Sequence, residues 1–318
     1  MKGLVLISSP LQLFLSLSIK SRFNLSSLDY VFFRDNTSNR HMQMEIMAKM
    51  YNINYYYESG YVSLFDQLKL SFRKTEKKYD YLFIGLFYQG LELVYLPFLK
   101  NNGCLFYLDD GNNSIDILKG NFTNNKFLFK RKLFKMRFMY KNYSMDNFYT
   151  IYKNIKSKIF NIVQNELHIE DLVNESDNCI YIIGTNASIY AKFVGLTLEQ
   201  FYARSKNFLK ELKNNTTKRI VFIPHGRDTS DVNERICKQL DIEYRRIDMC
   251  IELYFMLNKI YPSSIYGFGS TALYILKCIY PSMDIINLFM KGENCDGCVI
   301  YERVNNYLLT NNVQTIYV

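Results

Sequence analysis

The strongest constraint on the fold is a regular alternation of short apolar runs with longer amphipathic stretches. In the first part of the chain, the apolar runs predict strands at 3–8, 30–33, 54–57, 81–86 and 104–108. The stretches that follow these runs predict helices at 10–21, 41–51, 64–73 and 90–99. Strands that alternate with helices in this way predict a mostly parallel sheet covered on both faces.

The alternation stops between about residues 120 and 178, which are polar and basic and contain no evident buried strand. It resumes with expected strands at 179–183, 219–223, 264–267 and 284–288. Helices are expected at 198–212, 232–240 and 251–258 and from Ser270. A chain of 318 residues exceeds the usual size of one domain. We therefore predict an α/β protein with two Rossmann-like domains, 1–165 and 166–318, which face each other across a cleft.

The composition is that of an ordinary globular protein, with 48% hydrophobic and 22% charged residues. The apolar run near the N-terminus is short and is broken by Pro10, so it predicts a buried strand rather than a signal peptide. No segment approaches the apolar length of a membrane span. The seven cysteines are odd in number and lie mostly in apolar runs, which favours free thiols in a reducing compartment. We expect a cytoplasmic protein.

The net charge of +9 fits either a solvated basic surface or an anionic partner. The segment 126–141 is rich in Lys and Arg, contains no acid and is interleaved with aromatic and aliphatic residues. This pattern suits attachment to an anionic membrane surface, with a nucleic-acid contact or a solvated helix face as alternatives. The pair Cys295 and Cys298 has no second Cys or His pair near it, so we expect an Asp-Gly turn and no metal.

Two carboxylates follow the strand expected at 104–108. Because ligands of parallel α/β sheets bind outside the carboxyl ends of the strands, Asp109 and Asp110 are expected at a ligand-binding edge. One carboxylate can accept a proton from a hydroxyl while the other orients it. Gly111 allows a sharp turn. The alternative is a turn or a helix N-cap without chemistry.

His225 and Arg227 follow the strand expected at 219–223, in a loop that also contains Pro224 and Gly226. An imidazole and a guanidinium at one strand end suit a phosphate, since both donate hydrogen bonds to its oxygens. A polar strand-to-helix turn is the alternative. The residues Gly184, Thr185 and Asn186 follow the neighbouring expected strand.

A glycine-rich turn, which includes Gly269, Ser270 and Thr271, leads into an apolar helix. Backbone amides and hydroxyls at a helix N-terminus form an anion site, although Ser270 can also act as an ordinary cap. Glu252 begins another expected helix, where it either stabilises the helix dipole or accepts hydrogen bonds from a ribose diol.

Ser9 and Gln12 follow the first expected strand. Gln12 can bind the hydroxyl of an acceptor molecule. An ordinary helix start explains Ser9 and Pro10 equally well.

Three motifs occur in a fixed order: LDDG at 108–111, PHGR at 224–227 and GST at 269–271. This set resembles the bacterial sialyltransferases that share an Asp/Glu-Asp-Gly motif, a His-Pro motif and a Ser/Thr pair. The resemblance is closest to the lipooligosaccharide and capsule sialyltransferase family, whose start the segment 8–13 (SSPLQL) also resembles. It spans almost the whole chain through short motifs. One departure is that the family's His-Pro is His225-Gly226 here.

The resemblance implies a GT-B fold and an inverting, metal-independent transfer of sialic acid from CMP-sialic acid. The acceptor would be a terminal galactose-type sugar of a bacterial capsule or lipooligosaccharide, and no cofactor is implied beyond the nucleotide-sugar substrate. The general base would be the acid in the first or second position of the Asp-Asp-Gly motif; we favour Asp109, with Asp110 as its partner. His225 would assist the departure of CMP. The implied donor-binding residues are Gly184, Thr185, Asn186, Pro224, Gly226, Arg227, Glu252, Gly269, Ser270 and Thr271. The acceptor side would contain Ser9, Gln12 and Gly111.

Two other functions remain open at this point. One is another cytidine-nucleotide-dependent transferase, such as a CDP-glycerol glycerophosphotransferase. The other is a non-enzymatic basic protein that binds a membrane or nucleic acid, which explains the charge but not the polar clusters at several strand ends. If the protein is a sialyltransferase, we expect a nucleotide-sugar donor, a glycan acceptor and no nucleic-acid partner. Attachment of 126–141 to the inner membrane face would suit a lipid-linked acceptor.

Overall fold

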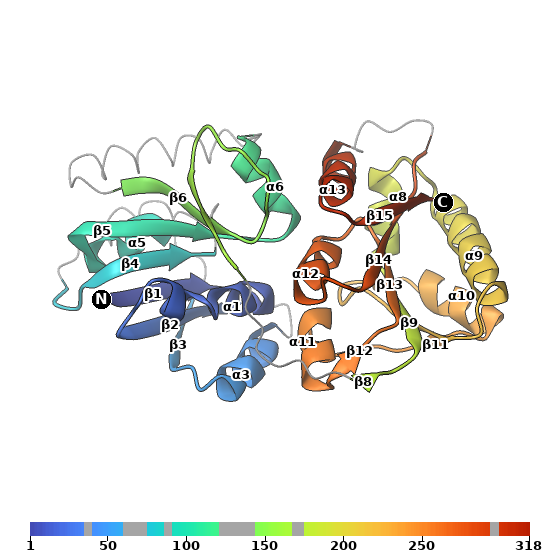
Figure 1. The fold of residues 1–318 in the computed structure, drawn as a ribbon, viewed down its shortest axis with the longest axis horizontal. Coiled ribbons are helices and arrows are strands. Elements are labelled where there is room, and N and C mark those ends of the chain that lie inside the picture. The colour runs from blue at the N-terminus through green and yellow to red at the C-terminus, as the bar shows by residue number, and fades with distance from the viewer. Residues whose placement is uncertain (35–39, 60–74, 86–90, 121–143, 167–174, 293–298) are drawn as a thin grey trace. The chain divides into compact units, whose positions relative to one another are not determined.

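The computed structural model describes residues 1–34, 40–59, 75–85, 91–120, 144–166, 175–292 and 299–318 (Figure 1). The chain divides into two compact units, Met1–His168 and Ile169–Val318. The boundary expected from the sequence, after residue 165, lies close to this division. The expected segments 64–73 and 126–141 and the pair Cys295 and Cys298 lie outside the described residues.

The first unit contains a seven-stranded sheet in the order β3-β2-β1-β4-β5-β6-β7, and all of its neighbouring strands are parallel. Its strands are β1 (Lys2–Ile7), β2 (Ser27–Arg34), β3 (Tyr55–Ser59), β4 (Tyr79–Ile84), β5 (Leu99–Leu108), β6 (Ser144–Thr150) and β7 (Asn161–Gln164). Its helices are α1 (Pro10–Ser16), α2 (Ile19–Arg22), α3 (Arg40–Met50), α5 (Leu91–Tyr95), the 3₁₀ turn η1 (Leu96–Phe98) and α6 (Asn112–Lys119).

The second unit contains a six-stranded parallel sheet in the order β11-β10-β9-β13-β14-β15 and a two-stranded sheet of β12 and β8. Its strands are β8 (Glu175–Ser176), β9 (Cys179–Ile183), β10 (Arg219–Ile223), β11 (Glu243–Tyr244), β12 (Ile260–Tyr261), β13 (Ser264–Phe268), β14 (Asp284–Phe289) and β15 (Gln314–Tyr317). Its helices are α8 (Ala187–Phe193), α9 (Leu198–Asn214), α10 (Val232–Leu240), α11 (Ile251–Leu257), α12 (Thr271–Ile279) and α13 (Val299–Thr310).

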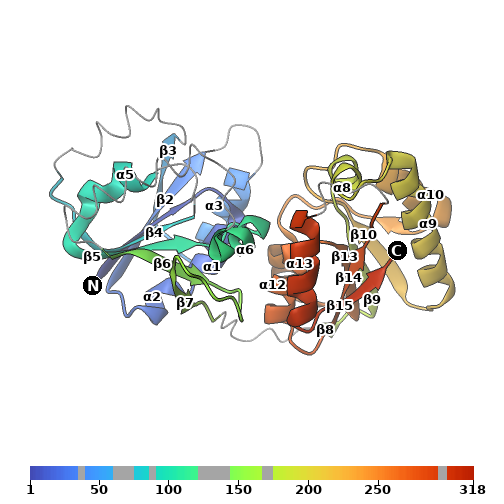
Figure 2. The same ribbon diagram turned by 90° about the horizontal axis from the view of Figure 1, so that it is seen from above.

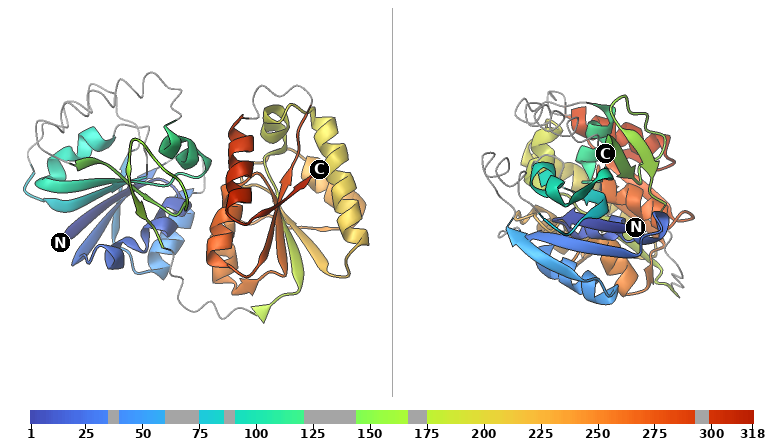
Figure 3. Two further views of the ribbon diagram at one scale, coloured as in Figure 1. Left: turned by 45° about the horizontal axis from the view of Figure 1, so that its top comes forward. Right: turned by 90° about the vertical axis from the view of Figure 1, so that its left-hand side faces the viewer.

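Helices cover both faces of the second sheet, with α8, α9 and α10 on one face and α11, α12 and α13 on the other (Figures 1 and 3). Alternate strand residues supply the two cores because side chains of a strand point to opposite faces. Ile180, Ile182 and Phe222 pack with the α8–α10 side. Tyr181 faces the other way and meets Phe255 of α11 at 5.0 Å between ring centroids. The predicted α/β class is therefore confirmed.

Both large sheets reverse their strand order beside the first strand of the sheet, at β1 and β4 and at β9 and β13 (Figures 1 and 2). Such switch points open a crevice at the carboxyl ends of the strands. The registers keep these ends level, since Leu6 pairs with Ile84 and Ile84 with Tyr107. In the second sheet Ile183 pairs with both Ile223 and Gly267. Loops that follow these strands therefore leave each sheet side by side.

The expectation that 120–178 contains no buried strand is wrong, because β6 lies within the sheet and its last residues are buried. Asn147 breaks the apolar pattern of this strand in the sequence. In the structure its side-chain amide donates to the Leu105 carbonyl at 3.1 Å and accepts from Asn161 at 3.0 Å. A buried polar side chain that is hydrogen-bonded in this way is compatible with a sheet interior.

Two of the helices expected in the first unit, at 10–21 and 90–99, are shorter than predicted. The helix expected at 10–21 is divided into α1 and α2, and the Ser16 hydroxyl at the end of α1 donates to the Leu13 carbonyl at 2.7 Å. The helix expected at 90–99 ends early, in a turn that contains Pro97, and β5 begins already at Leu99. Pro and local hydroxyl bonds interrupt helices in this way.

Candidate active site

Asp109 lies at the end of β5 and only 1% of its surface is exposed. Oδ1 accepts a hydrogen bond from Thr150 Oγ1 at 2.7 Å, and Oδ2 accepts one from the Ile151 backbone amide at 2.8 Å. Burial raises the pKa of Asp109 to about 7, and the hydrogen bonds oppose this rise. Both carboxylate oxygens are therefore engaged inside the protein.

Asp110 is less buried than Asp109 and is held at a tight turn. Its backbone amide donates to Ser114 Oγ of α6 at 2.6 Å. Gly111 then adopts φ 62° and ψ −138°, a conformation that residues with a side chain avoid, before α6 begins. Burial also raises the pKa of the Asp110 carboxyl, and a hydrogen bond from Gln12 opposes this rise. This carboxylate is the more accessible one at the strand edge.

Gln12 lies in α1 and is fully buried. Its Nε2 donates to the Gly85 carbonyl at 2.5 Å and to Asp110 Oδ1 at 3.0 Å, while Oε1 accepts from the Ser8 amide at 2.9 Å. Both amide N–H groups are thus used within the protein rather than left for an acceptor hydroxyl. Gln12 connects the carboxyl ends of β1, β4 and β5 at the switch point.

Ser9 is the N-cap of α1, and its hydroxyl accepts from the Gln12 backbone amide at 3.3 Å. Pro10 occupies the first position of the helix, where it needs no amide hydrogen. The structure thus places Ser9, Gln12, Asp109, Asp110 and Gly111 together at one edge of the first sheet.

His225 follows β10 in the second unit and is exposed. Its Nδ1 accepts a hydrogen bond from the Arg227 backbone amide at 3.1 Å. In the neutral imidazole this leaves the proton on Nε2, which is then available as a donor. Gly226 has no atom within 4 Å of the position that a Cβ would take, so the loop tip is open.

The loop after β9 is fastened to the His225 loop. The Asn186 side chain caps α8 and also donates to the Arg227 carbonyl at 2.9 Å. The buried Asp228 accepts from Asn233 at 2.8 Å and from the Ser230 hydroxyl at 2.8 Å. These bonds define the shape of an exposed edge that carries an imidazole and the Arg227 guanidinium.

The loop after β9 also passes close to the one after β10. A Cβ at Gly184 would lie 2.7 Å from the Phe222 ring and 3.1 Å from Cα of Pro224. Gly184 is therefore required for close approach of the two loops. Thr185, the next residue, is half-buried at this edge.

The turn after β13 completes the second cluster. Gly269 adopts φ 52°, and its amide donates to the side chain of buried Asn287 at 2.9 Å. Ser270 is the N-cap of α12 and accepts from the Ala272 amide at 3.2 Å, while Thr271 begins the helix. The positive end of the α12 dipole therefore lies at the same sheet edge as His225.

Asn287 belongs to a buried network that holds this turn. Its side-chain amide donates to Asn305 of α13 at 2.8 Å, and Thr315 of β15 donates to the same Asn305 oxygen at 2.8 Å. The turn at Gly269 is thus fixed from the interior of the unit.

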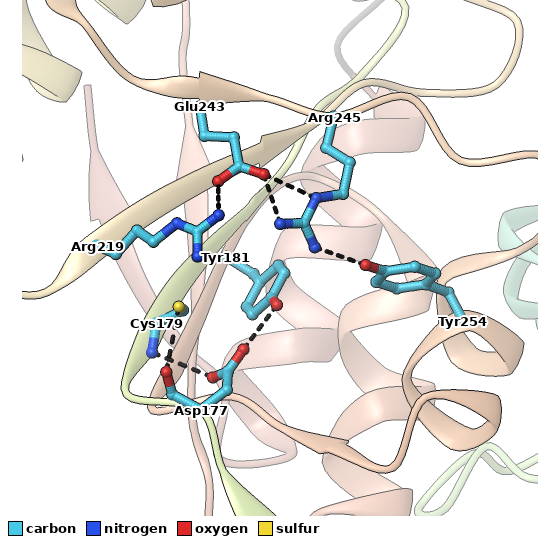
Figure 4. A network of polar contacts seen from close by, with 7 residues as sticks. All are labelled: Asp177, Cys179, Tyr181, Arg219, Glu243, Arg245 and Tyr254. Atoms are coloured by element: carbon cyan, nitrogen blue, oxygen red, sulfur yellow. Dashed lines mark hydrogen bonds and ion pairs between the residues drawn. The ribbon is translucent and has the colours of Figure 1, made fainter.

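Glu252 lies in the first turn of α11 and is 6% exposed. Burial raises the pKa of its carboxyl, against the hydrogen bonds from its own amide and from Cys250. The helix that carries it is anchored by Arg245, which donates to Tyr254 at 2.6 Å and to Glu243 (Figure 4). Glu243 also accepts from Arg219, and a separate set of hydrogen bonds joins Asp177 to Cys179 and to Tyr181 (Figure 4).

Sequence reasoning missed several residues of these clusters. Arg246 follows β11, is exposed and donates to the Asp228 carbonyl at 3.3 Å, which adds a guanidinium beside the His225 loop. Asn287 and Thr150 hold the Gly269 turn and Asp109 from neighbouring strands. A lone Asn inside the apolar run 284–289 was a usable signal, whereas nothing in the sequence marks Thr150.

Within the described ranges, no group of three or more His, Cys, Asp and Glu side chains is placed to hold a metal ion. No helix among these same residues has both the length and the apolar character to cross a membrane.

A comparison of the sequence with known protein families and with curated proteins finds no match. Among solved structures, the chain is similar to an α/β-galactoside α-2,3-sialyltransferase from Photobacterium phosphoreum, with a TM-score of 0.53 and 12% identity. That match covers 99% of this chain and 98% of the other. The E. coli heptosyltransferase WaaC, solved with ADP-2-deoxy-2-fluoro heptose, matches at a TM-score of 0.40 and 10% identity, over 98% of this chain and 100% of the other. The fold is that of the GT-B glycosyltransferases.

Proposed function

We propose that the chain is an inverting sialyltransferase, which moves sialic acid from CMP-sialic acid to a terminal galactose-type sugar of a bacterial capsule or lipooligosaccharide. The observation that carries this proposal is a division of chemistry. The switch point of the first sheet gathers carboxylates, and that of the second gathers anion-binding groups. A carboxylate can activate an acceptor hydroxyl, and anion-binding groups can hold a departing nucleotide.

The second unit would bind the donor. The α12 N-terminus with Ser270 and Thr271 binds the phosphate of CMP, and His225 donates to it through Nε2–H. The guanidinium of Arg227 adds positive charge at this edge. Glu252 accepts hydrogen bonds from the ribose or the base, as buried acids do in other nucleotide-binding sheets.

In the transfer step, the acceptor oxygen forms a bond to the anomeric carbon of sialic acid from the face opposite the phosphate. The bond from that carbon to the phosphate oxygen breaks, and its electron pair leaves with CMP. The proton of the acceptor hydroxyl passes to a carboxylate of the first unit. The His225 hydrogen bond stabilises the negative charge that develops on the phosphate.

We assign the base to Asp110. Asp109, which we favoured from the sequence, has both oxygens occupied by Thr150 and Ile151 and is almost completely buried. Asp110 is more accessible and has one oxygen engaged by Gln12. A general base must reach the proton that it removes, and the greater exposure of Asp110 supports its assignment over Asp109.

The proposal is tested by incubating the full chain with CMP-sialic acid and lactose, with and without EDTA, and measuring CMP release and sialyl-lactose. We expect transfer in both conditions, since donors of the protein hold the leaving phosphate. Asp110→Asn should lower kcat about 100-fold or more, whereas Asp109→Asn should retain most activity. Full transfer by Asp110→Asn would exclude the assignment of the base.

A thermal-shift comparison of CMP, CDP and UDP tests the nucleotide separately. Stronger stabilisation by CMP supports the proposal. Stronger stabilisation by CDP together with turnover of CDP-glycerol would replace it with a glycerophosphotransferase, and stronger stabilisation by UDP would contradict both. A separate assay with anionic vesicles tests membrane attachment. Binding of the protein that salt reverses would support attachment through the basic segment 126–141.

A further inference from the structure

Among the described residues, Gln12 is the only side chain that donates a hydrogen bond to the Asp110 carboxylate. The glutamine approaches from α1, with its amide fully buried beneath the strand ends. A buried amide of this kind contributes to function through its orientation, so the orientation has to be established first.

The orientation of the Gln12 amide is fixed by its backbone partners. The Ser8 amide can only donate, so the atom at 2.9 Å from it must be the oxygen of Gln12. The Gly85 carbonyl can only accept, so the atom at 2.5 Å from it must be the nitrogen. A flipped amide would place donor against donor and acceptor against acceptor. The second N–H of Nε2 is consequently available to Asp110 Oδ1.

Gly85 provides the space for this arrangement. A Cβ at this position would lie 2.5 Å from Cδ of Gln12, closer than real carbon atoms approach. The Gly85 amide is itself held by the Leu6 carbonyl at 2.8 Å, so the backbone there cannot easily withdraw. The residues after β1 and β4 are thus arranged around one glutamine side chain.

The charged groups near Asp110 determine how much the Gln12 hydrogen bond can change the protonation of the Asp110 carboxyl. Asp109 precedes it, α1 contains no ionisable side chain, and α6 carries Asp116 and Lys119. After β6, Tyr152 donates to the Gly111 carbonyl at 3.1 Å rather than to the carboxylate. An amide N–H stabilises a carboxylate more than a neutral carboxyl, because it can only donate.

We propose that Gln12 is a positioning residue for the base: it holds Oδ1 of Asp110, favours the deprotonated carboxylate and leaves Oδ2 for the acceptor hydroxyl. This inference rests on the proposed function, in which Asp110 removes the acceptor proton. Burial alone raises the pKa of Asp110, and the Gln12 bond acts against that rise. Gln12 therefore does not bind the acceptor itself but controls the group that does.

The test compares the full-length wild type with Gln12→Met, which keeps the length of the side chain but removes both hydrogen-bonding groups. We expect kcat at neutral pH to fall about 10- to 100-fold, as for a misplaced catalytic group, with the KM for CMP-sialic acid unchanged. The acidic limb of the kcat profile should move to higher pH. Ser16→Ala, which removes a buried hydrogen bond of the same helix, should leave that limb in place.

Direct titration of Asp110 by carboxyl NMR separates this inference from the proposed function. A higher midpoint in Gln12→Met supports the inference even where the wild type transfers no sialic acid, a result that would overturn only the proposed function. An unchanged midpoint and an unchanged acidic limb would overturn the inference. Gln12→Leu, which also lacks hydrogen-bonding groups, serves where Gln12→Met does not fold; it should move the midpoint in the same direction because it also removes the N–H donor to the carboxylate.

Discussion

Thr150 Oγ1 donates a hydrogen bond of 2.7 Å to Oδ1 of Asp109, and this bond fastens the end of β6 to the end of β5. The Ile151 amide adds a second bond to the other oxygen, at 2.8 Å. The first aspartate of the pair therefore belongs to the framework of the sheet, and it shapes the turn that presents the second. Two adjacent identical residues thus have different environments and different expected effects when they are replaced.

Asp109→Asn should change how stability depends on pH. The folded protein keeps the Asp109 proton up to about pH 7, while an unfolded aspartate releases it near 3.8. Between these values the folded state binds more protons, so this residue makes stability fall as the pH rises and level off above about 7. The variant should lack this fall and gain roughly 1 to 4 kcal/mol relative to wild type between pH 5 and 8.

Urea unfolding of the full chain at several pH values measures this difference. Asp80→Asn is the matched control, since a hydrogen bond from Lys100 lowers the pKa of Asp80 and its contribution is lost only in more acidic solution. The control should therefore show no added change between pH 5 and 8. If the free energies of unfolding of wild type and Asp109→Asn changed with pH in the same way, the pKa of Asp109 would not be raised in the folded protein.

Gly111→Ala should destabilise the first unit. Gly111 has φ 62° and ψ −138°, which an alanine reaches only at a cost of about 1 to 3 kcal/mol. Because Asp110 precedes it directly, relief of this strain should also turn the carboxylate and lower kcat. Denaturant unfolding and steady-state kinetics measure the two effects.

A second glycine provides the comparison for stability. Gly226 has open space around its Cβ position and no positive φ. Gly226→Ala should leave stability unchanged or raise it by up to about 1 kcal/mol, since alanine restricts the unfolded chain. Equal losses in the two variants would mean that the turn at Gly111 carries no special backbone requirement.

Asn287→Leu should weaken CMP binding without touching the nucleotide. It removes the buried partner of the Gly269 amide, and an unsatisfied buried donor costs about 1 to 3 kcal/mol. The Gly269 turn can escape this cost by moving, so we expect about a tenfold weaker Kd for CMP by calorimetry. Thr315→Val removes the hydroxyl that contacts Asn305 and Nδ2 of Asn287 but keeps Oδ1 of Asn287 on the Gly269 amide, so it should lower stability while the Kd stays the same. An unaltered Kd in Asn287→Leu would exclude control of the turn from the interior.

The sequence was most informative where strands are uniformly apolar. The expected strands 179–183 and 219–223 and the helix 232–240 coincide with β9, β10 and α10. Short runs of Ile, Val and Phe bounded by polar turns leave little doubt about a buried strand. The loops after such strands lie at the carboxyl ends of a parallel sheet because of its topology alone. Most candidate site residues are therefore found at these strand ends.

Other features depend on contacts between distant parts of the chain. β6 was missed because Asn147 interrupts it, and the partners of Asn147 lie on β5 and β7. The difference between Asp109 and Asp110 arises from Thr150 and from Gln12, which lie far from them in sequence. Local periodicity contains no information on such partners, because they are defined by strand order and register.

Glu252→Gln should remove a pH dependence from nucleotide binding. Burial raises the pKa of Glu252, so in the free protein this carboxyl takes up a proton at a higher pH than an ordinary glutamate does. If the carboxylate accepts hydrogen bonds from the nucleotide, binding favours the ionised form, and wild-type affinity for CMP gains as the pH rises through this pKa. Glutamine cannot ionise, so the variant should bind about tenfold more weakly than wild type above the raised pKa and approach wild type as the pH falls through it.

Calorimetric titration with CMP at each pH gives the Kd of Glu252→Gln and of wild type. Protonation of CMP and of His225 affects both constants equally, so it cancels in their ratio. Glu234→Gln is a suitable control, because Glu234 lies in the first turn of α10 and is exposed. Its ratio to wild type should not vary with pH, since only a general helix-dipole effect is removed. A ratio for Glu252→Gln that is equally flat would assign Glu252 to the stability of α11, through the same dipole, rather than to recognition of the nucleotide.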